Sequence, residues 1–116
     1  MVTRLCIALL LFGAAYSAAS AHTMLRHASP AAGSTVASAP HDVTITFSEP
    51  IEPAFSGASV RNTSGQRVDT GAKSSGTTMQ ISVKPLPPGT YKVEWHVLSV
   101  DTHRTQGSFS FTVGGR

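Results

Sequence analysis

Cysteine is almost absent from this chain of 116 residues, because the single cysteine, Cys6, lies in the first segment. Charged residues make up only 13% of the sequence and aromatic residues only 7%. Beyond the first segment, disulfides and thiolate metal ligands are therefore excluded. The basic residues are scattered and form no stripe of positive charge, which argues against a nucleic-acid-binding protein.

The first 21 residues are typical of a secretory signal peptide. A basic start containing Arg4 is followed by the apolar run 5–15 and by a stretch of small residues. The run is about half the ~20 residues that a membrane-spanning helix requires. Ala19 and Ala21 flank Ser20 as an A-x-A site, so we predict cleavage after Ala21. Domain 22–116 then begins at His22, and we expect a soluble mature protein in the periplasm.

Cleavage removes 21 of the 116 residues and leaves 95, with eight Lys and Arg against six Asp and Glu. In this part of the chain apolar residues alternate with polar ones, and Pro, Gly, Ser and Asn interrupt them every eight to twelve residues. No window has the spacing of an amphipathic helix. The pattern is typical of one small all-β sandwich or barrel. The expected strands are 43–47, 58–62, 66–68, 78–83, 90–100 and 107–113, after a first strand near Leu25, and 31–40 is expected to be a loop.

His22 is the first of two candidate metal-binding features. As the mature terminus it carries a free α-amino group and an imidazole on one residue, and the two can close a chelate ring on a metal ion. Their ordinary pKa values, about 8 and about 6.5, allow a divalent metal to displace the remaining proton near neutral pH. Taken alone, an N-terminal histidine is more often an accident of cleavage.

The second feature is the sequence Asp101-Thr102-His103 between the last two expected strands. In an extended backbone the side chains of Asp101 and His103 would share a face, with Cα atoms about 6.6 Å apart. One metal ion can then bridge the carboxylate and the imidazole, although a solvated polar turn is the commoner role of such a motif. Together with His22 the donors are two imidazoles, one amine and one carboxylate. This set suits Cu(II), and zinc can use His and Asp as well.

Three segments resemble the CopC-type periplasmic copper-binding proteins. The mature start 22–25 with Ser29-Pro30-Ala31-Ala32-Gly33-Ser34 resembles the family's opening, and Phe47-Ser48-Glu49-Pro50-Ile51 also fits. The longest resemblance is Pro88-Gly89-Thr90-Tyr91-Lys92-Val93-Glu94-Trp95-His96-Val97-Leu98-Ser99-Val100-Asp101-Thr102-His103, followed by Gly107-Ser108-Phe109-Ser110-Phe111. The similarity therefore spans essentially the whole mature chain.

This resemblance implies an Ig-like Greek-key fold of about seven strands. It also implies one Cu(II) per chain, with His22, Asp101 and His103 as ligands, and a role in copper buffering, transport or resistance. An inner-membrane copper-transport protein is the implied partner. Some family members have a second, Cu(I) site in a Met-rich loop, but 60–68 contains neither Met nor His. The chain is therefore predicted to bind Cu(II) only.

The other candidate residues are expected to be structural or solvated. Met24 should pack, and His41 and His96 should have no metal role, while His27 is the likeliest spare ligand because it shares the first segment with His22. Trp95 is expected in the core. Two other functions stay open at this point: a copper oxygenase-like enzyme with an N-terminal histidine, for which aromatic residues are few, and a metal-free Ig-like interaction module.

Overall fold

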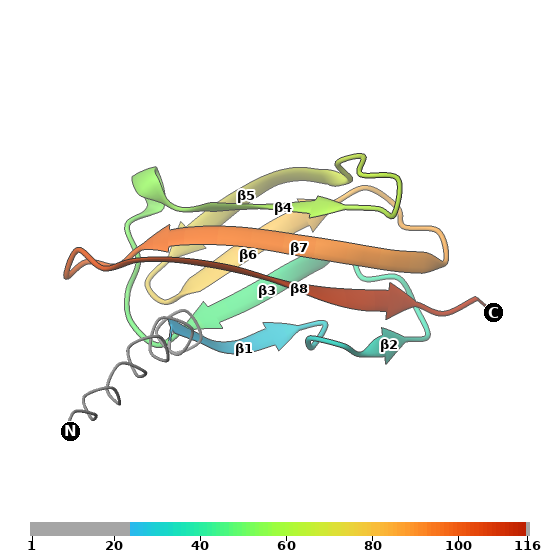
Figure 1. Cartoon of the computed structure of the whole chain (residues 1–116), viewed down its shortest axis with the longest axis horizontal. Coiled ribbons are helices and arrows are strands. Elements are labelled where there is room, and N and C mark those ends of the chain that lie inside the picture. Colours follow the sequence, from blue (N-terminus) through green and yellow to red (C-terminus); the bar gives the residue numbers. More distant parts are fainter. Residues whose placement is uncertain (1–23, 116) are drawn as a thin grey trace, which may run out of the picture.

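The computed structural model describes residues 24–115, so His22 and the predicted signal segment lie outside the described residues. Eight strands form two four-stranded sheets that pack face to face (Figure 1). The strands are β1 (Leu25–Ser29), β2 (Thr35–Val36), β3 (Asp42–Phe47), β4 (Gly57–Arg61), β5 (Asp69–Ser75), β6 (Thr78–Val83), β7 (Gly89–Leu98) and β8 (Arg104–Val113). A short 3-10 turn, η1 (Pro53–Phe55), precedes β4.

The order of the strands is β1-β3-β6-β5 in one sheet and β2-β8-β7-β4 in the other. All neighbours are antiparallel except β2 and β8, which run parallel. The chain thus crosses between the sheets repeatedly, which confirms the predicted all-β sandwich. Within residues 24–115, no helix has the length and apolar character that crossing a bilayer requires.

Alternating side chains of both sheets meet in one core, as the period of two predicts. The fully or nearly buried members on the strands are Val43, Ile45, Phe47, Val60, Met79, Ile81, Tyr91, Val93, Trp95, Val97, Phe111 and Val113. Trp95 is 5% exposed and packs its ring edge-to-face against Phe47 at a centroid distance of 5.2 Å. The prediction that Trp95 belongs to the core is therefore confirmed.

Three details of the predicted secondary structure are wrong. No strand forms over 66–68, where only an isolated bridge joins Arg67 to Arg61. The Asn62 side chain instead accepts hydrogen bonds from the amides of Ser64 and Gln66, both at 3.0 Å, and organises a turn. The loop expected at 31–40 contains the two-residue strand β2, and β5 was not foreseen.

The Asp69 carboxylate joins the edges of the two sheets between β4 and β5. Its Oδ1 accepts a hydrogen bond from the Val60 amide at 2.9 Å, and its Oδ2 accepts one from Arg67 at 2.7 Å. The side chain is only 2% exposed. Burial by itself would raise the pKa of Asp69, but the hydrogen bonds from Arg67 and Val60 outweigh it and lower the pKa below 3.8.

Asp69→Asn is expected to lower the free energy of unfolding by about 2 kcal/mol at pH 7, because it removes a charged acceptor from a buried hydrogen-bonded site. The pKa of Asp69 is lower in the folded protein than in the unfolded chain. The stability that ionised Asp69 contributes is therefore complete above the unfolded pKa and is lost as pH falls through the folded pKa. The difference between wild type and variant should therefore shrink below about pH 4. Urea unfolding at several pH values measures it. Asp42→Asn, at a carboxylate that accepts one bond from Gln80, is the control and should change stability less.

Gly107 on β8 leaves the space that the Trp95 indole fills. A Cβ atom at Gly107 would lie 2.7 Å from Trp95 Cζ2, whereas one at Gly57 would lie 3.1 Å from the ring of the exposed His96. Gly107→Ala should therefore cost about 1 to 3 kcal/mol in urea unfolding. Gly57→Ala should cost much less because the His96 ring can turn away. Equal costs for the two variants would show that Trp95 does not pack on β8 in solution.

Candidate metal centre

The turn between β7 and β8 carries two of the predicted ligands. Asp101 Oδ1 lies 3.4 Å from His103 Nδ1, and the two side chains are 54% and 74% exposed. The structure thus brings Asp101 and His103 together, as predicted, and leaves both accessible to an ion from solvent. Residues 24–115 contain no cluster of three or more His, Cys, Asp or Glu side chains suited to a metal.

The backbone that joins the two residues is a turn and is not extended. Thr102 has φ of 74°, in the left-handed region that a β-branched residue rarely adopts. Its amide donates a hydrogen bond to the Ser99 carbonyl at 2.9 Å. Asp101 and His103 therefore come together because the chain reverses at Thr102, so the extended geometry considered from the sequence is wrong here.

The Asp101 carboxylate is stabilised in its charged form. A hydrogen bond from the Ser99 hydroxyl lowers the pKa of Asp101 below its ordinary value, against a smaller opposing effect of desolvation. The neighbouring His103 lowers it further. A carboxylate that is ionised at neutral pH is ready to bind a cation without first losing a proton.

The first described residues and the β7–β8 turn lie at the same end of the sandwich (Figure 1). The segment 48–52 connects them. The Ser48 amide donates to the Met24 carbonyl at 2.6 Å, and the Val100 amide donates to the Pro50 carbonyl at 3.1 Å. Ile51 also forms a β-bridge with Ser99. Ser48, which bonds to the start of the domain, and Pro50, which bonds to the β7–β8 turn, are therefore only two residues apart.

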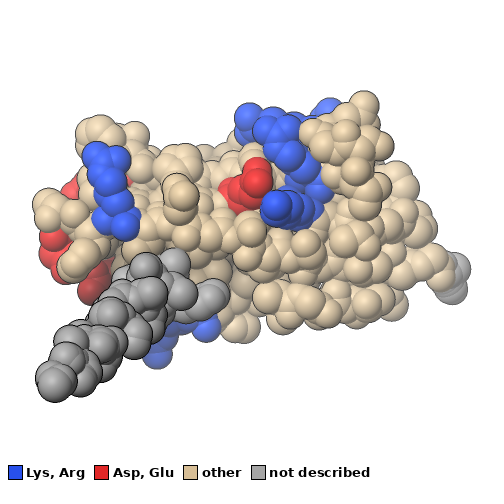
Figure 2. All heavy atoms as spheres, viewed as in Figure 1, with Lys and Arg blue, Asp and Glu red and all other residues tan. Residues whose placement is uncertain are grey.

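Glu49 lies in this connecting segment, one residue before Pro50. Its Oε1 atom is buried without a hydrogen-bond partner within the described part of the protein. Such an unpaired buried oxygen is costly and is available to a bound ion or water. Acidic side chains gather at this end of the molecule in Figure 2. The sequence offered no sign of this, since Glu49 reaches Asp101 only through the pairing of Pro50 with Val100.

The remaining candidates have other surroundings. Met24 is 5% exposed and packs in the core, as expected, with its sulfur 3.8 Å from the Ser48 hydroxyl. His27, His41 and His96 are exposed, at separate positions on β1, before β3 and on β7. Whether His27 contacts a metal depends on His22 and stays a prediction.

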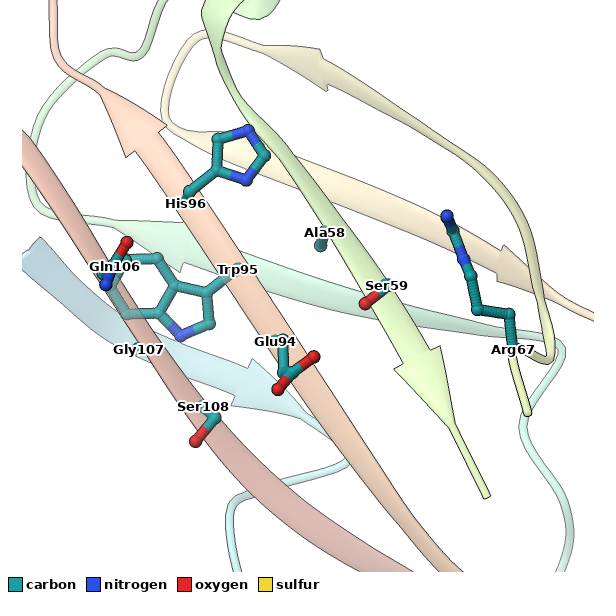
Figure 3. Close-up of a pocket in the computed structure, with 9 residues that line it drawn as sticks. All are labelled: Ala58, Ser59, Arg67, Glu94, Trp95, His96, Gln106, Gly107 and Ser108. Atoms are coloured by element: carbon teal, nitrogen blue, oxygen red, sulfur yellow. The ribbon is translucent and has the colours of Figure 1, made fainter. Parts of the chain in front are cut away.

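A groove of about 620 Å³ lies on the outer face of β4, β7 and β8, and His96 is one of its lining residues (Figure 3). Its charged side chains already have protein partners. Arg67 lies 2.7 Å from Asp69, and Glu94 lies 3.7 Å from Lys92. His96 points toward β4, away from Glu94. The groove therefore lacks converging donors for a metal.

Aromatic side chains do not form a flat substrate face in the described residues. Trp95 lies on the inner side of β7 in Figure 3, and it is 5% exposed. Tyr91 is stacked on Phe111 and is equally buried. Phe55 is the large aromatic residue that is well exposed, at 64%. These positions disfavour the copper oxygenase that binds polysaccharide through a planar aromatic surface.

These observations define a small two-sheet β-sandwich that displays a carboxylate and an imidazole at one end. Residues 25–114 match the family model described as CopC domain. The chain belongs to the CopC family.

Among curated proteins, Protein YobA of Escherichia coli K12 is 41% identical over 80% of this chain and 79% of its own length. Copper resistance protein C of E. coli is 37% identical over 90% of both chains. The copper transport protein CutJ of Bacillus subtilis is 37% identical over 81% of this chain, but the matched part is only 18% of CutJ. Relatives named for their role are thus copper resistance and copper transport proteins.

Solved structures support the same family. CopC from Methylosinus trichosporium OB3b has a TM-score of 0.76 at 35% identity, with 82% of this chain and 96% of that one covered. PcoC of E. coli, described as a methionine-rich copper resistance protein, has a TM-score of 0.68 at 38% identity over 80% and 99%. The present chain has only three methionines, and Met24 and Met79 are both buried.

Thr102→Gly is expected not to lower the free energy of unfolding, and to raise it by up to about 1 kcal/mol, because glycine adopts the left-handed conformation without strain. The same change at Thr44, which lies in the middle of β3, should cost about 1 kcal/mol. Urea unfolding of the two variants makes the comparison. A cost at Thr102 as large as that at Thr44 would contradict the turn described above.

Proposed function

We propose that this protein is an exported copper carrier or buffer that holds one Cu(II). The ligands are the α-amino group and imidazole of His22, exposed by cleavage after Ala21, together with Asp101 and His103. The observation that carries the proposal is the Asp101–His103 pair, 3.4 Å apart and accessible, at the end of the sandwich where the described chain begins.

Chain length supports the placement of His22 near this pair. His22 precedes Met24 by two residues, and two extended residues span at most about 7 Å. Met24 is itself fixed, because its side chain is buried and its carbonyl is bonded to Ser48. A short tether from a fixed point costs little entropy to close over a site. Glu49 adds a further carboxylate beside the site.

The donors determine the metal. Amine, imidazole and carboxylate are nitrogen and oxygen ligands, for which Cu(II) ranks above the other divalent first-row ions. A Cu(I) site needs soft sulfur ligands, and within residues 24–115 both thioethers are buried in the core. We therefore propose a Cu(II) site without a companion Cu(I) site, unlike the arrangement expected in a methionine-rich relative.

We further propose that copper is exchanged in the periplasm with an inner-membrane copper-transport protein. The support is the similarity to a region of CutJ that makes up 18% of that longer copper transport protein. A region similar to this chain is thus joined covalently to the rest of a copper transport protein, which supports an exchange of copper between such a domain and a transport protein.

The test is a comparison between the mature protein beginning at His22 and a version with one glycine ahead of it. The extension converts the amine into a peptide amide, so Cu(II) affinity should fall at least about tenfold, which corresponds to 1.4 kcal/mol. Competition titration with a chelator measures the affinity, and electron paramagnetic resonance reports the ligands. His41→Ala in the mature protein, at an exposed histidine before β3, is the control and should keep both. Unchanged binding by the extended form would overturn the proposal.

A further inference from the structure

We infer that Ser99 is the positioning residue of this metal site, which holds Asp101 and His103 in place before copper arrives. The inference rests on the proposed function and adds to it a residue that does not contact the ion. Asp101 and His103 are exposed, and side chains so exposed ordinarily move among several rotamers. Something buried must therefore fix them if the pair is to be ready for an ion.

Ser99 is the buried polar residue of the described chain, with 1% exposure. Its hydroxyl donates a hydrogen bond to Asp101 Oδ1 and accepts one from the His103 amide at 3.1 Å. One hydroxyl thus contacts both residues of the pair, through the carboxylate of one and the backbone of the other. Its donor and its acceptor are both in use, so it has a defined orientation.

The main chain of Ser99 closes the same turn. Its amide donates to the His103 carbonyl at 2.9 Å, and its carbonyl accepts from the Thr102 amide at 2.9 Å. Ser99 is also bridged to Ile51, a core residue with 3% exposure. The turn is therefore hydrogen-bonded to Ser99, a residue that is itself fixed against the core through Ile51. Ser99 thus connects the two ligand residues to the rigid part of the sandwich.

The backbone contacts survive replacement of the side chain, whereas the hydroxyl contacts do not. Ser99→Ala should keep the β-bridge to Ile51 and the main-chain hydrogen bonds with the Thr102 amide and the His103 carbonyl. The fold should therefore remain. It frees the Asp101 carboxylate to rotate and leaves the His103 amide without its acceptor. Ser99→Thr keeps a hydroxyl on the same atom and is the conservative variant.

Ser56 offers a matched control at the same end of the molecule. Its hydroxyl accepts a hydrogen bond from the Leu98 amide at 3.1 Å, one residue before Ser99, and is likewise partly buried. It has no hydrogen bond to Asp101, Thr102 or His103 in the described contacts. Ser56→Ala therefore removes a comparable bond without touching the pair.

The experiment uses the mature protein and its variants Ser99→Ala, Ser99→Thr, Ser56→Ala and Asp101→Ala. Chelator competition should show Cu(II) affinity lowered about 10- to 100-fold by Ser99→Ala, the range found when a group that orients a metal ligand is lost. Its electron paramagnetic resonance spectrum should become heterogeneous. Ser99→Thr should restore the wild-type affinity and spectrum, and Ser56→Ala should retain both even where its thermal stability falls.

A second readout needs no metal. In the copper-free wild type the His103 amide should exchange with solvent more slowly than the Asp101 amide, and Ser99→Ala should abolish that difference. If Ser99→Ala has wild-type affinity, spectrum and amide exchange, the role of Ser99 is overturned. If Asp101→Ala loses Cu(II) binding in the same experiment, the proposed function still stands. Full binding by Asp101→Ala would overturn both.

Discussion

The site depends on the segment 48–52, whose main-chain hydrogen bonds hold the start of the domain next to the β7–β8 turn. It bonds to Met24 at one end and to Val100 and Leu98 further along, with the Glu52 amide donating to the Leu98 carbonyl at 2.8 Å. β1 and the β7–β8 turn belong to different sheets. The segment 48–52 is hydrogen-bonded to the start of the domain and to the end of β7, so it joins the two sheets at this end. Because these are main-chain hydrogen bonds, their strength does not depend on pH or on the charge of a ligand.

Behind that segment, the core gives the end of the sandwich its shape. Phe47 ends β3 just before the connecting segment, and its ring packs on Trp95, which in turn fills the space left by Gly107. Close-packed aromatic contacts of this kind resist displacement. The ligand-bearing turn is short and rises directly from β7 and β8, so little of its position is left to a flexible loop. A binding protein benefits because few degrees of freedom remain to be ordered by the ion.

Much of the fold follows from alternation alone. β3, β6 and β7 bury every second residue, and their Val, Ile, Phe and Tyr side chains predict both the strands and the inner faces. β5 could not be found in this way, because Asp69–Ser75 has no large apolar residue. It is an edge strand held by backbone pairing with β6 and by the Asp69 carboxylate, neither of which leaves a periodic trace in the sequence.

Some residues of the site could likewise be predicted from the sequence, and others could not. Asp101 and His103 were identified from spacing and resemblance, and the structure brings them together, although through the reversal at Thr102. Ser99 and Glu49 were missed, because a small buried hydroxyl and a carboxylate beside a proline have no signature until tertiary pairing puts them next to the turn. His22 stays a prediction that depends on where the signal peptide is cut.

Paramagnetic broadening of amide signals measures where the ion binds on the protein. Substoichiometric Cu(II) added to ¹⁵N-labelled mature protein should erase the amide signals of 23–25, 48–49 and 99–104 first. The amides of Lys84, Leu86 and Gly89, at the opposite end of the sandwich, should keep their intensity. Broadening centred on His41 or His96, with the β7–β8 turn unaffected, would contradict the site described here.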